Sequence, residues 1–341
     1  MKDNPSLQAD MVVLAIGVTP DTVLAKEAGL ELGIKESIVV NDRMETSVPD
    51  IYAAGDAVQV KHYVTGNDAL ISLAGPANKQ GRIIADNICG GDSRYLGSQG
   101  SSVIKVFDMT AATTGINETN AKKSGLEVDT VILSPMSHAG YYPGGKVMTM
   151  KVVFEKETYR LLGAQIIGYE GVDKRIDVLA TAIHAGLKAT QLKDLDLAYA
   201  PPYSSAKDPV NMAGFMIDNI AKGTLKQWHL EDMDKISKDK SVVLLDVRTV
   251  GEFNRGHMDG FRNIPVDELR ERINEIEKGK PVYLICQSGL RSYIASRILE
   301  GNGYETYNFS GGFRFYDAVV NDRALIERAY ACGMDYYCLL Y

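Results

Sequence analysis

The carboxyl-terminal part of the sequence alternates short apolar runs with helical patterns. Runs at 241–246, 281–285 and 305–309 are rich in Val, Leu, Ile and aromatic residues. Such runs are typical of strands buried on both faces of a parallel sheet. The alternation continues over about ninety residues and predicts a compact parallel sheet flanked by helices. The expected helices cover 230–236, 267–276 and 293–299, with a further short helix after Gly312, and 263–265 is expected to be strand-like.

A cysteine loop lies within this alternating region. Cys286 ends one apolar run, and four residues, Gln287, Ser288, Gly289 and Leu290, separate it from Arg291 and Ser292 at the start of a helix. A loop that closes on a helix N-terminus directs several backbone N–H groups at one point, and the helix end and Arg291 add positive potential. A cysteine held there is expected to be a nucleophilic thiolate. The alternative is a buried, unreactive cysteine at a strand end.

Composition limits the classes of protein that fit. The chain has 341 residues, which suggests two or three domains, and its net charge of -7 disfavours nucleic acid as a partner. No apolar run is long enough to span a bilayer, and no signal peptide is recognised. The four cysteines, Cys89, Cys286, Cys332 and Cys338, are too few for a disulfide scaffold and predict a reducing, cytoplasmic location. Their spacing predicts no metal site.

The amino-terminal part reads as pieces of an open α/β sheet. Strands are expected over 9–17, 38–41 and 51–54, and helices over 21–28 and 76–88. Asp56 follows the third strand, at the carboxyl end where open α/β sheets bind ligands.

Two stretches in this part resemble signatures of the flavin-dependent pyridine nucleotide–disulfide oxidoreductases: Ala15-Ile-Gly-Val-Thr-Pro20 and Thr46 to Ala57. The resemblance implies an FAD site in which Asp56 binds the ribityl chain, with NAD(P)H as electron donor. It also implies that the helix N-terminus at Ala74 and Gly75 faces the flavin ring. The cofactor-binding residues implied are Gly17, Pro20, Gly55, Asp56, Ala74 and Gly75.

Other hallmarks of that family are absent from the sequence. No Gly-x-Gly-x-x-Gly fingerprint follows a strand, so residues 1–98 resemble only the last NAD-domain strand and the second half of the FAD domain. We therefore expect Met1 to be internal to a longer parent, flavin to bind poorly and sheet edges to be exposed.

Residues 99–225 predict an antiparallel sheet with helices. Strands are expected over 102–107, 111–115, 130–133, 146–154 and 161–167, and helices over 118–124, 172–185 and 210–220. The arrangement resembles the family's dimerisation domain. This implies a head-to-tail homodimer in which each subunit completes the other's flavin site.

Two tyrosine clusters, at 141–145 and 197–203, stand in this region. The Ala-Pro-Pro-Tyr-Ser string resembles the coenzyme A-disulfide reductase and NADH:persulfide reductase branch. That resemblance implies a phenol that protonates or stabilises a departing thiolate. Tyr141 and Tyr199 are the first candidates, with Tyr142 and Tyr203 as neighbours. The alternative is ordinary interface packing.

The carboxyl-terminal motifs resemble a rhodanese domain over 229–320, entered through a linker at 224–229 and followed by a tail at 321–341. The match rests on Val243 to Arg248, Glu252-Phe253, Gly256-His257, Asn263-Ile-Pro265 and Cys286 to Ser292. It implies that Cys286 attacks a sulfane-sulfur donor and carries a persulfide, which Arg291 and the N–H groups of Gln287 to Ser292 stabilise. The loop is one residue shorter than in related phosphatases, which favours sulfur over phosphate. An ion pair between Asp246 and Arg248 is expected to brace the loop.

The sequence thus predicts an α/β and α+β multidomain chain: a partial FAD-binding Rossmann-like half, an antiparallel dimerisation domain and a rhodanese α/β domain. Its function is predicted as part of a flavin-dependent NAD(P)H:disulfide or persulfide reductase of the CoA-disulfide type, joined to a sulfurtransferase. Reductase activity of this chain alone is not expected. The partners implied are CoA persulfide or disulfide, thiosulfate and polysulfide. The alternative is a non-catalytic sulfur-carrier or dimerisation module.

Overall fold

The computed structural model describes residues 8–330. Its contacts divide the chain into two compact units, one mainly of 131–151 and 189 onward, the other of 14–130 and 152–188. The domain boundaries expected from the sequence, after residues 98, 225 and 320, remain predictions.

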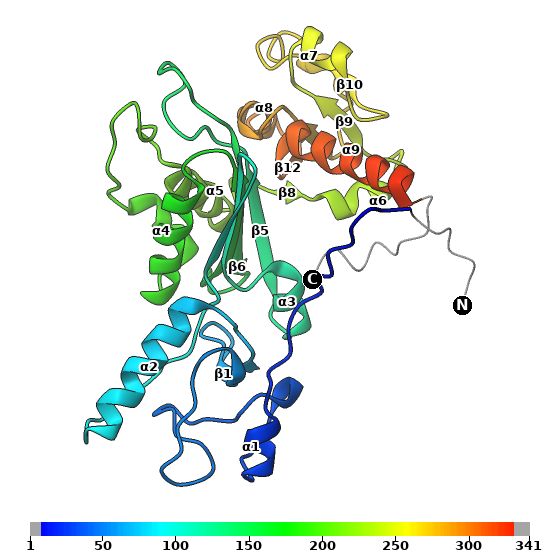
Figure 1. The fold of residues 1–341 in the computed structure, drawn as a ribbon. Helices are drawn as coiled ribbons and strands as arrows, with labels where there is room; N and C mark the ends of the chain where they lie inside the picture. Colours follow the sequence, from blue (N-terminus) through cyan, green and yellow to red (C-terminus); the bar gives the residue numbers. More distant parts are fainter. Residues whose placement is uncertain (1–7, 331–341) are drawn as a thin grey trace. The chain divides into compact units, whose positions relative to one another are not determined.

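The carboxyl-terminal region contains a five-stranded sheet in the order β10-β9-β11-β12-β8, and all its pairings are parallel. The predicted parallel α/β architecture is confirmed. The strands are β8 (Gln227–Trp228), β9 (Val243–Asp246), β10 (Arg262–Asn263), β11 (Val282–Ile285) and β12 (Thr306–Phe309). The helices are α6 (Met233–Ile236), α7 (Val250–Arg255), α8 (Leu290–Glu300) and α9 (Gly312–Tyr330) (Figure 1).

Three sequence-based expectations in this region were wrong. The segment expected as a linker contains β8, an edge strand of the sheet, because the Trp228 ring is buried against Phe309 at 4.5 Å and its Nε1 donates to the Leu284 carbonyl. The helix expected over 267–276 is a series of turns ending in a 3₁₀ helix at Ile273–Glu275. The Tyr304 hydroxyl lies 3.1 Å from the Ile273 carbonyl oxygen and 3.0 Å from that of Ile276, and so it holds the end of this segment. The closing helix α9 is long, with 19 residues, not short.

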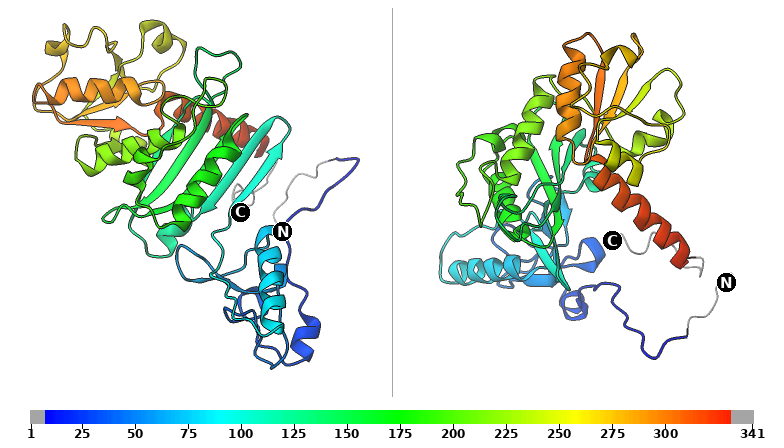
Figure 2. Two further views of the ribbon diagram at one scale, coloured as in Figure 1. Left: turned by 90° about the vertical axis from the view of Figure 1, so that its left-hand side faces the viewer. Right: turned by 90° about the horizontal axis from the view of Figure 1, so that it is seen from above.

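A second five-stranded sheet follows the order β3-β4-β7-β6-β5. Its strands are β3 (Ser102–Val106), β4 (Met109–Gly115), β5 (Val128–Leu133), β6 (Met148–Glu155) and β7 (Leu161–Gly168), and the pairings of β4 with β3 and β7 are antiparallel. The predicted helices appear as α3 (Glu118–Lys123), α4 (Val172–His184) and α5 (Pro209–Ala221), with a 3₁₀ helix at Ala189–Asp194 before α5. Helix α4 packs on β4 and β7 (Figure 2) and buries Ile176, Leu179 and Ile183.

Gly115 permits this packing. Its φ is +68°, and a Cβ there would lie 2.1 Å from the Leu162 carbonyl oxygen, so no side chain fits. β4 therefore ends at a glycine where its backbone comes close to β7.

The amino-terminal region keeps its predicted helices, α1 (Val23–Glu27) and α2 (Ala74–Ile88), but not its strands. The strand expected over 9–17 was wrong: the segment is unpaired among the described residues, and Ile16 is 86% exposed. The strands expected over 38–41 and 51–54 were also wrong and are reduced to isolated bridges, from Ile38 to Leu32 and Val58 and from Tyr52 to Glu45. A parallel strand needs neighbours to pair its backbone, and no described segment supplies them.

What remains of regular structure here is short. It comprises β1 (Val60–Lys61), β2 (Asp68–Ala69) and 3₁₀ helices at Ile34–Glu36 and Gly55–Ala57. Met44, Val58 and Val60 form a small buried cluster. In the described part of the chain, no helix has the length and apolar character needed to cross a membrane.

Candidate functional site: a cysteine loop, a tyrosine pair and part of a flavin site

Cys286 lies directly after β11, which is the central strand of the parallel sheet, and it is 1% exposed. The backbone N–H of Gly289 donates to its Sγ at 3.1 Å. The Ser292 Oγ lies 3.2 Å from Sγ and 3.1 Å from the Gly289 carbonyl oxygen, so its one hydroxyl hydrogen is shared between these two acceptors. Gly289 has φ +100° and caps α8, which turns its N–H toward the sulfur. The structure therefore brings two donors to Sγ. It records no hydrogen bond to Sγ from Gln287, Ser288 or Leu290 among the described contacts, and Leu290 is exposed.

Asn308, which the sequence analysis did not single out, holds this cradle from β12. Its Nδ2 donates to the Gly289 carbonyl at 3.1 Å, and its buried Oδ1 has no described partner. This contact joins β12 to the turn that carries Gly289. The sequence signal for Asn308 was a polar residue inside an otherwise apolar strand.

The back of the cysteine loop rests on the start of α9. Phe313 N–H donates to the Cys286 carbonyl at 2.8 Å, and Arg314 N–H donates to the Gln287 carbonyl at 3.1 Å. Gly312 has φ +68°, and a Cβ there would lie 2.7 Å from the Gln287 carbonyl oxygen. The carbonyl groups of the cysteine loop are thus held by the start of α9.

Arg291 is paired and is not a free cation. Its two terminal nitrogens bind the two oxygens of Glu252 at 2.6 and 2.7 Å. The bidentate contact lowers the pKa of Glu252 to about 2 and raises the pKa of Arg291 above its ordinary value. Glu252 also completes a capping box with Thr249 at the start of α7. Glu252 is part of the motif that resembles a rhodanese domain, but its pairing with Arg291, 39 residues away, was not predicted from the sequence.

Asp246 and Arg248 form the ion pair expected from the sequence. Arg248 Nη2 lies 2.7 Å from Asp246 Oδ2, and both side chains are almost fully buried. Arg248 also donates to the Gly256 carbonyl at 2.8 Å and to Gln287 Oε1 at 3.4 Å, and its guanidinium lies 3.8 Å from the Phe313 ring centre. The pair therefore braces the cysteine loop from β9.

The two tyrosine clusters meet through one residue each. The hydroxyls of Tyr141 and Tyr199 lie 2.7 Å apart although 58 residues separate them in sequence. This hydrogen bond raises the pKa of Tyr199. Tyr142 instead packs edge-on against His138, and Tyr203 is exposed. Of the four tyrosines considered, the structure pairs the two first candidates.

The residues expected to hold FAD fit that cofactor in part. Gly55 has φ +83° and donates its N–H to Gln80 Oε1 of α2 at 2.7 Å, which places exposed Asp56 beside that helix. Helix α2 begins at Ala74 and Gly75 with no side-chain cap, so its N-terminal N–H groups can face an anion. Gly17 and Pro20 lie on the unpaired extended segment, and no described contact joins them to Asp56. Cys332 and Cys338 lie outside the described residues.

Comparisons with known proteins agree with this architecture. Residues 1–81 match the pyridine nucleotide-disulphide oxidoreductase family, and residues 101–209 match its dimerisation domain. Residues 229–318 match the rhodanese-like domain.

Among curated proteins, the chain is 39% identical over 208 residues to an NAD(P)H sulfur oxidoreductase (CoA-dependent) of Pyrococcus furiosus, covering 61% of this chain and 47% of that protein. It is 35% identical over 207 residues to a coenzyme A disulfide reductase of Staphylococcus aureus, covering 60% and 47%. The chain spans about half the length of these relatives.

Among solved structures, reduced Bacillus anthracis CoADR-RHD matches with a TM-score of 0.91 and 47% identity, over 94% of this chain and 58% of that one. A NAD-dependent persulfide reductase from A. fulgidus matches with a TM-score of 0.83 and 42% identity, over 90% and 56%. The parallel sheet around Cys286, the antiparallel sheet and these matches lead to one conclusion: the chain belongs to the pyridine nucleotide-disulphide oxidoreductase family and carries a carboxyl-terminal rhodanese-like domain.

Proposed function

We propose that the chain is part of an NAD(P)H-dependent disulfide or persulfide reductase of the CoA-disulfide type, and that Cys286 carries sulfane sulfur as a persulfide. One observation supports the sulfur chemistry most directly: a backbone N–H and a hydroxyl converge on a buried cysteine sulfur at the end of the central strand. The names of the relatives support the reductase assignment.

The sulfur step balances without a further oxidant. The Cys286 thiolate attacks the outer sulfur of thiosulfate, a new S–S bond forms, the S–S bond of thiosulfate breaks, and sulfite leaves. An acceptor thiolate then attacks the outer persulfide sulfur, takes that sulfur and returns the Cys286 thiolate. The Gly289 N–H and the Ser292 hydroxyl stabilise the negative charge that returns to Sγ, and Leu290, Ser288 and Gln287 border the loop. Arg291, held by Glu252 in a bidentate ion pair, would help to orient the loop.

The reductase part rests on the family resemblance. FAD, when bound, would relay electrons from NAD(P)H to the disulfide or persulfide. Asp56 would hold the ribityl chain, Gly55 would allow close approach, and Ala74 and Gly75 would direct N–H groups at the flavin. Gly17 and Pro20 would complete the site. The Tyr141 hydroxyl would accept a hydrogen bond from the Tyr199 hydroxyl. Its own O–H would then be free to donate to a departing CoA thiolate, in a homodimer.

The donors and acceptors implied are CoA persulfide or disulfide, thiosulfate and polysulfide, and the cytoplasmic location stays a prediction. The alternative of a non-catalytic carrier or dimerisation module is not favoured, because the relatives carry reductase names.

A sulfurtransferase assay tests the proposal. The purified chain is mixed with thiosulfate and a thiol, and sulfite release is measured. We expect Cys286→Ala to lower turnover at least about 100-fold. Cys89→Ala is the matched control, because Cys89 is a free but exposed cysteine far from the loop in sequence. Equal turnover in wild type and Cys286→Ala contradicts the proposal. A mass increase of one sulfur atom on wild type without turnover would favour the carrier.

A further inference from the structure

Exposed apolar side chains gather at the edge of the parallel sheet where Cys286 lies. Among residues 227–321, whose side chains the structure describes, four large apolar side chains are exposed. Three of them, Val250, Leu290 and Ile294, lie in the first two turns of α7 and α8. Large apolar side chains that are scattered singly need no explanation, whereas a group of them marks a contact surface.

The fold brings these side chains to one edge of the sheet. Helices α7 and α8 follow the adjacent parallel strands β9 and β11, so both begin at the end where Cys286 lies. The ion pair between Glu252 and Arg291 joins the first turns of the two helices at 2.6 Å. Leu290 belongs to the cysteine loop itself, and Ile294 follows it by four residues on the same face of α8. Leu290 and Ile294 therefore form an apolar rim beside the loop.

Two arginines next to the cysteine loop are each balanced by a carboxylate. Both terminal nitrogens of Arg291 bind Glu252, and the pKa of Glu252 is lowered to about 2, so this carboxylate stays ionised at neutral pH. Arg248 is paired with Asp246, and both side chains are almost fully buried. Neither guanidinium is therefore free to bind a dianionic donor such as thiosulfate.

The depth of Cys286 divides a sulfur donor into two parts. The residue is 1% exposed, so only a slender terminal sulfur atom of a donor can approach Sγ. The group that carries this sulfur has to remain outside the loop, where Leu290 is 66% and Ile294 43% exposed. An aliphatic group placed there would cover these side chains and remove both surfaces from water, which is favourable.

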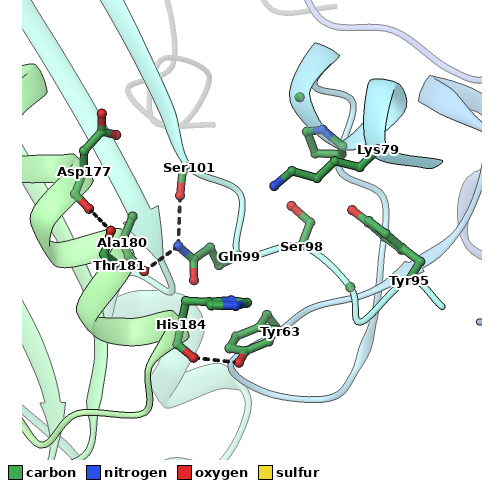
Figure 3. Close-up of a pocket in the computed structure, with 13 residues that line it drawn as sticks. Tyr63, Lys79, Tyr95, Ser98, Gln99, Ser101, Asp177, Ala180, Thr181 and His184 are labelled. Atoms are coloured by element: carbon green, nitrogen blue, oxygen red, sulfur yellow. Dashed lines mark hydrogen bonds between the residues drawn. The ribbon is translucent and has the colours of Figure 1, made fainter. Parts of the chain in front are cut away.

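The pocket in Figure 3 lacks this combination. It has a volume of about 590 Å³ and lies between α2, the 95–101 loop and α4, in the other compact unit. Its lining contains no cysteine and no Leu, Ile, Val or Met, and its Tyr63 and His184 rings stack on each other. Of the two places, only the edge at Cys286 sets exposed aliphatic side chains beside a sulfur atom.

Building on the sulfurtransferase role given above to Cys286, we propose that Leu290 and Ile294 select sulfane-sulfur donors that carry an aliphatic group beside the sulfur-bearing end, in preference to small inorganic dianions. Alkanethiosulfonates represent this class. The Cys286 thiolate attacks the terminal sulfur of the thiosulfonate, a new S–S bond forms, the S–S bond of the donor breaks, and the alkanesulfinate leaves with the electron pair. Cyanide then takes the outer sulfur as thiocyanate and returns the thiolate.

Thiocyanate formation by the full chain from three donors tests the proposal. Butanethiosulfonate and methanethiosulfonate share the same reacting group and charge and differ in the length of the aliphatic group, and thiosulfate is the inorganic dianion. We expect kcat/KM for butanethiosulfonate to exceed that for methanethiosulfonate at least about fivefold. Equal values for the two thiosulfonates overturn the proposal. Equal thiocyanate formation by wild type and Cys286→Ala would instead contradict the sulfurtransferase role itself, so the two failures are distinguishable.

Substitutions assign the selection to the rim. Leu290→Ser and Ile294→Ser should each lower the ratio of kcat/KM for butanethiosulfonate to that for methanethiosulfonate at least about twofold. Leu96→Ser is the matched control, because Leu96 is 70% exposed and lies in the other compact unit, and its ratio should equal that of wild type. An unchanged ratio in both rim variants contradicts the assignment.

A charge variant tests the discrimination against dianions. Glu252→Gln leaves Arg291 without its carboxylate partner. We expect kcat/KM for thiosulfate to rise at least about twofold relative to that for methanethiosulfonate, because the dianion carries twice the charge. No rise in this ratio would show that the ion pair does not disfavour the dianion, and it would overturn that part of the proposal.

Discussion

The carboxyl-terminal sheet and the amino-terminal region contain similar apolar runs, but one run forms a buried strand and the other is unpaired and exposed. Val282–Ile285 is a central strand with parallel partners on both sides, and Leu284 is fully buried. Met11 to Leu14 has an equally apolar sequence, yet no described segment pairs with it and Leu14 is 78% exposed. The difference shows that an apolar run becomes a strand only when neighbouring strands satisfy its backbone and helices cover its side chains.

The same contrast applies to the chemistry. After β11, the start of α8 places Gly289 and Ser292 against the Cys286 sulfur, and the neighbouring strand β12 places Asn308 against the Gly289 carbonyl. In the amino-terminal region, Asp56 and α2 are arranged together while Gly17 and Pro20 stay apart from them. Sites at strand ends form only where the sheet itself is assembled.

The largest expected effect comes from truncating matched leucines in the two runs. Leu284→Ala should lower the free energy of unfolding by about 2–5 kcal/mol, because it leaves a cavity in a packed core. Leu14→Ala should change it by less than about 0.5 kcal/mol, because that side chain is already in water. Urea denaturation measures the free energy of unfolding of both variants. Similar losses in the two variants would contradict the conclusion that only the carboxyl-terminal run is packed in a core.

The support behind the cysteine loop is the next test. Gly312→Ala should destabilise the chain by about 1–3 kcal/mol, because the residue has φ +68° and its Cβ would contact the Gln287 carbonyl oxygen. Gly251→Ala in α7 is the control, since a Cβ there meets nothing within 4 Å and alanine favours a helix by about 0.5–1 kcal/mol. In thermal unfolding, the midpoint temperature should fall for Gly312→Ala and rise for Gly251→Ala. A neutral Gly312→Ala would mean that the loop does not rest tightly on α9.

The Glu252–Arg291 pair predicts a pH dependence of stability. The pKa of Glu252 is lowered to about 2 in the folded chain from 4.5, so its stabilisation is complete above pH 4.5 and is lost as the pH falls toward 2. After allowance for partial exposure, the pair should contribute about 2 kcal/mol. When the pH is lowered from 5 to 3, the free energy of unfolding should therefore fall less for Glu252→Gln than for wild type. Denaturant titrations at these pH values measure the difference, and parallel curves would argue against the pair.

The smallest effect concerns the tyrosine pair. The Tyr141 hydroxyl raises the pKa of Tyr199, so Tyr141→Phe should move Tyr199 ionisation back toward lower pH. The absorbance of phenolate during a pH titration follows this, and stability should change by less than about 0.5 kcal/mol because both rings are largely exposed. Tyr203→Phe serves as control and should leave the Tyr199 titration unchanged.

Much of the architecture was predictable because local periodicity encodes it. The alternating pattern gave the parallel sheet, and the amphipathic stretch at 172–185 gave α4 within a residue of its observed end. The position of Cys286 at the end of a buried strand, beside a glycine and before a helix, followed from the same local signals.

Contacts between distant residues were not predictable, since no local pattern specifies them. Trp228 looked like part of a linker, but pairing of its segment with β12 made it an edge strand. Glu252 and Arg291 are 39 residues apart in sequence, and they meet because α7 and α8 follow the adjacent parallel strands β9 and β11.

The sequence by itself determined the kinds of element, the cysteine loop and the family to which the chain belongs. Only the tertiary structure decided that Arg291 is neutralised by Glu252, that Tyr141 meets Tyr199, and that residues 9–17 are not a strand. The physical reason is the same in each case. Periodicity depends on neighbours along the chain, whereas burial, ion pairing and strand formation depend on which distant segments supply partners.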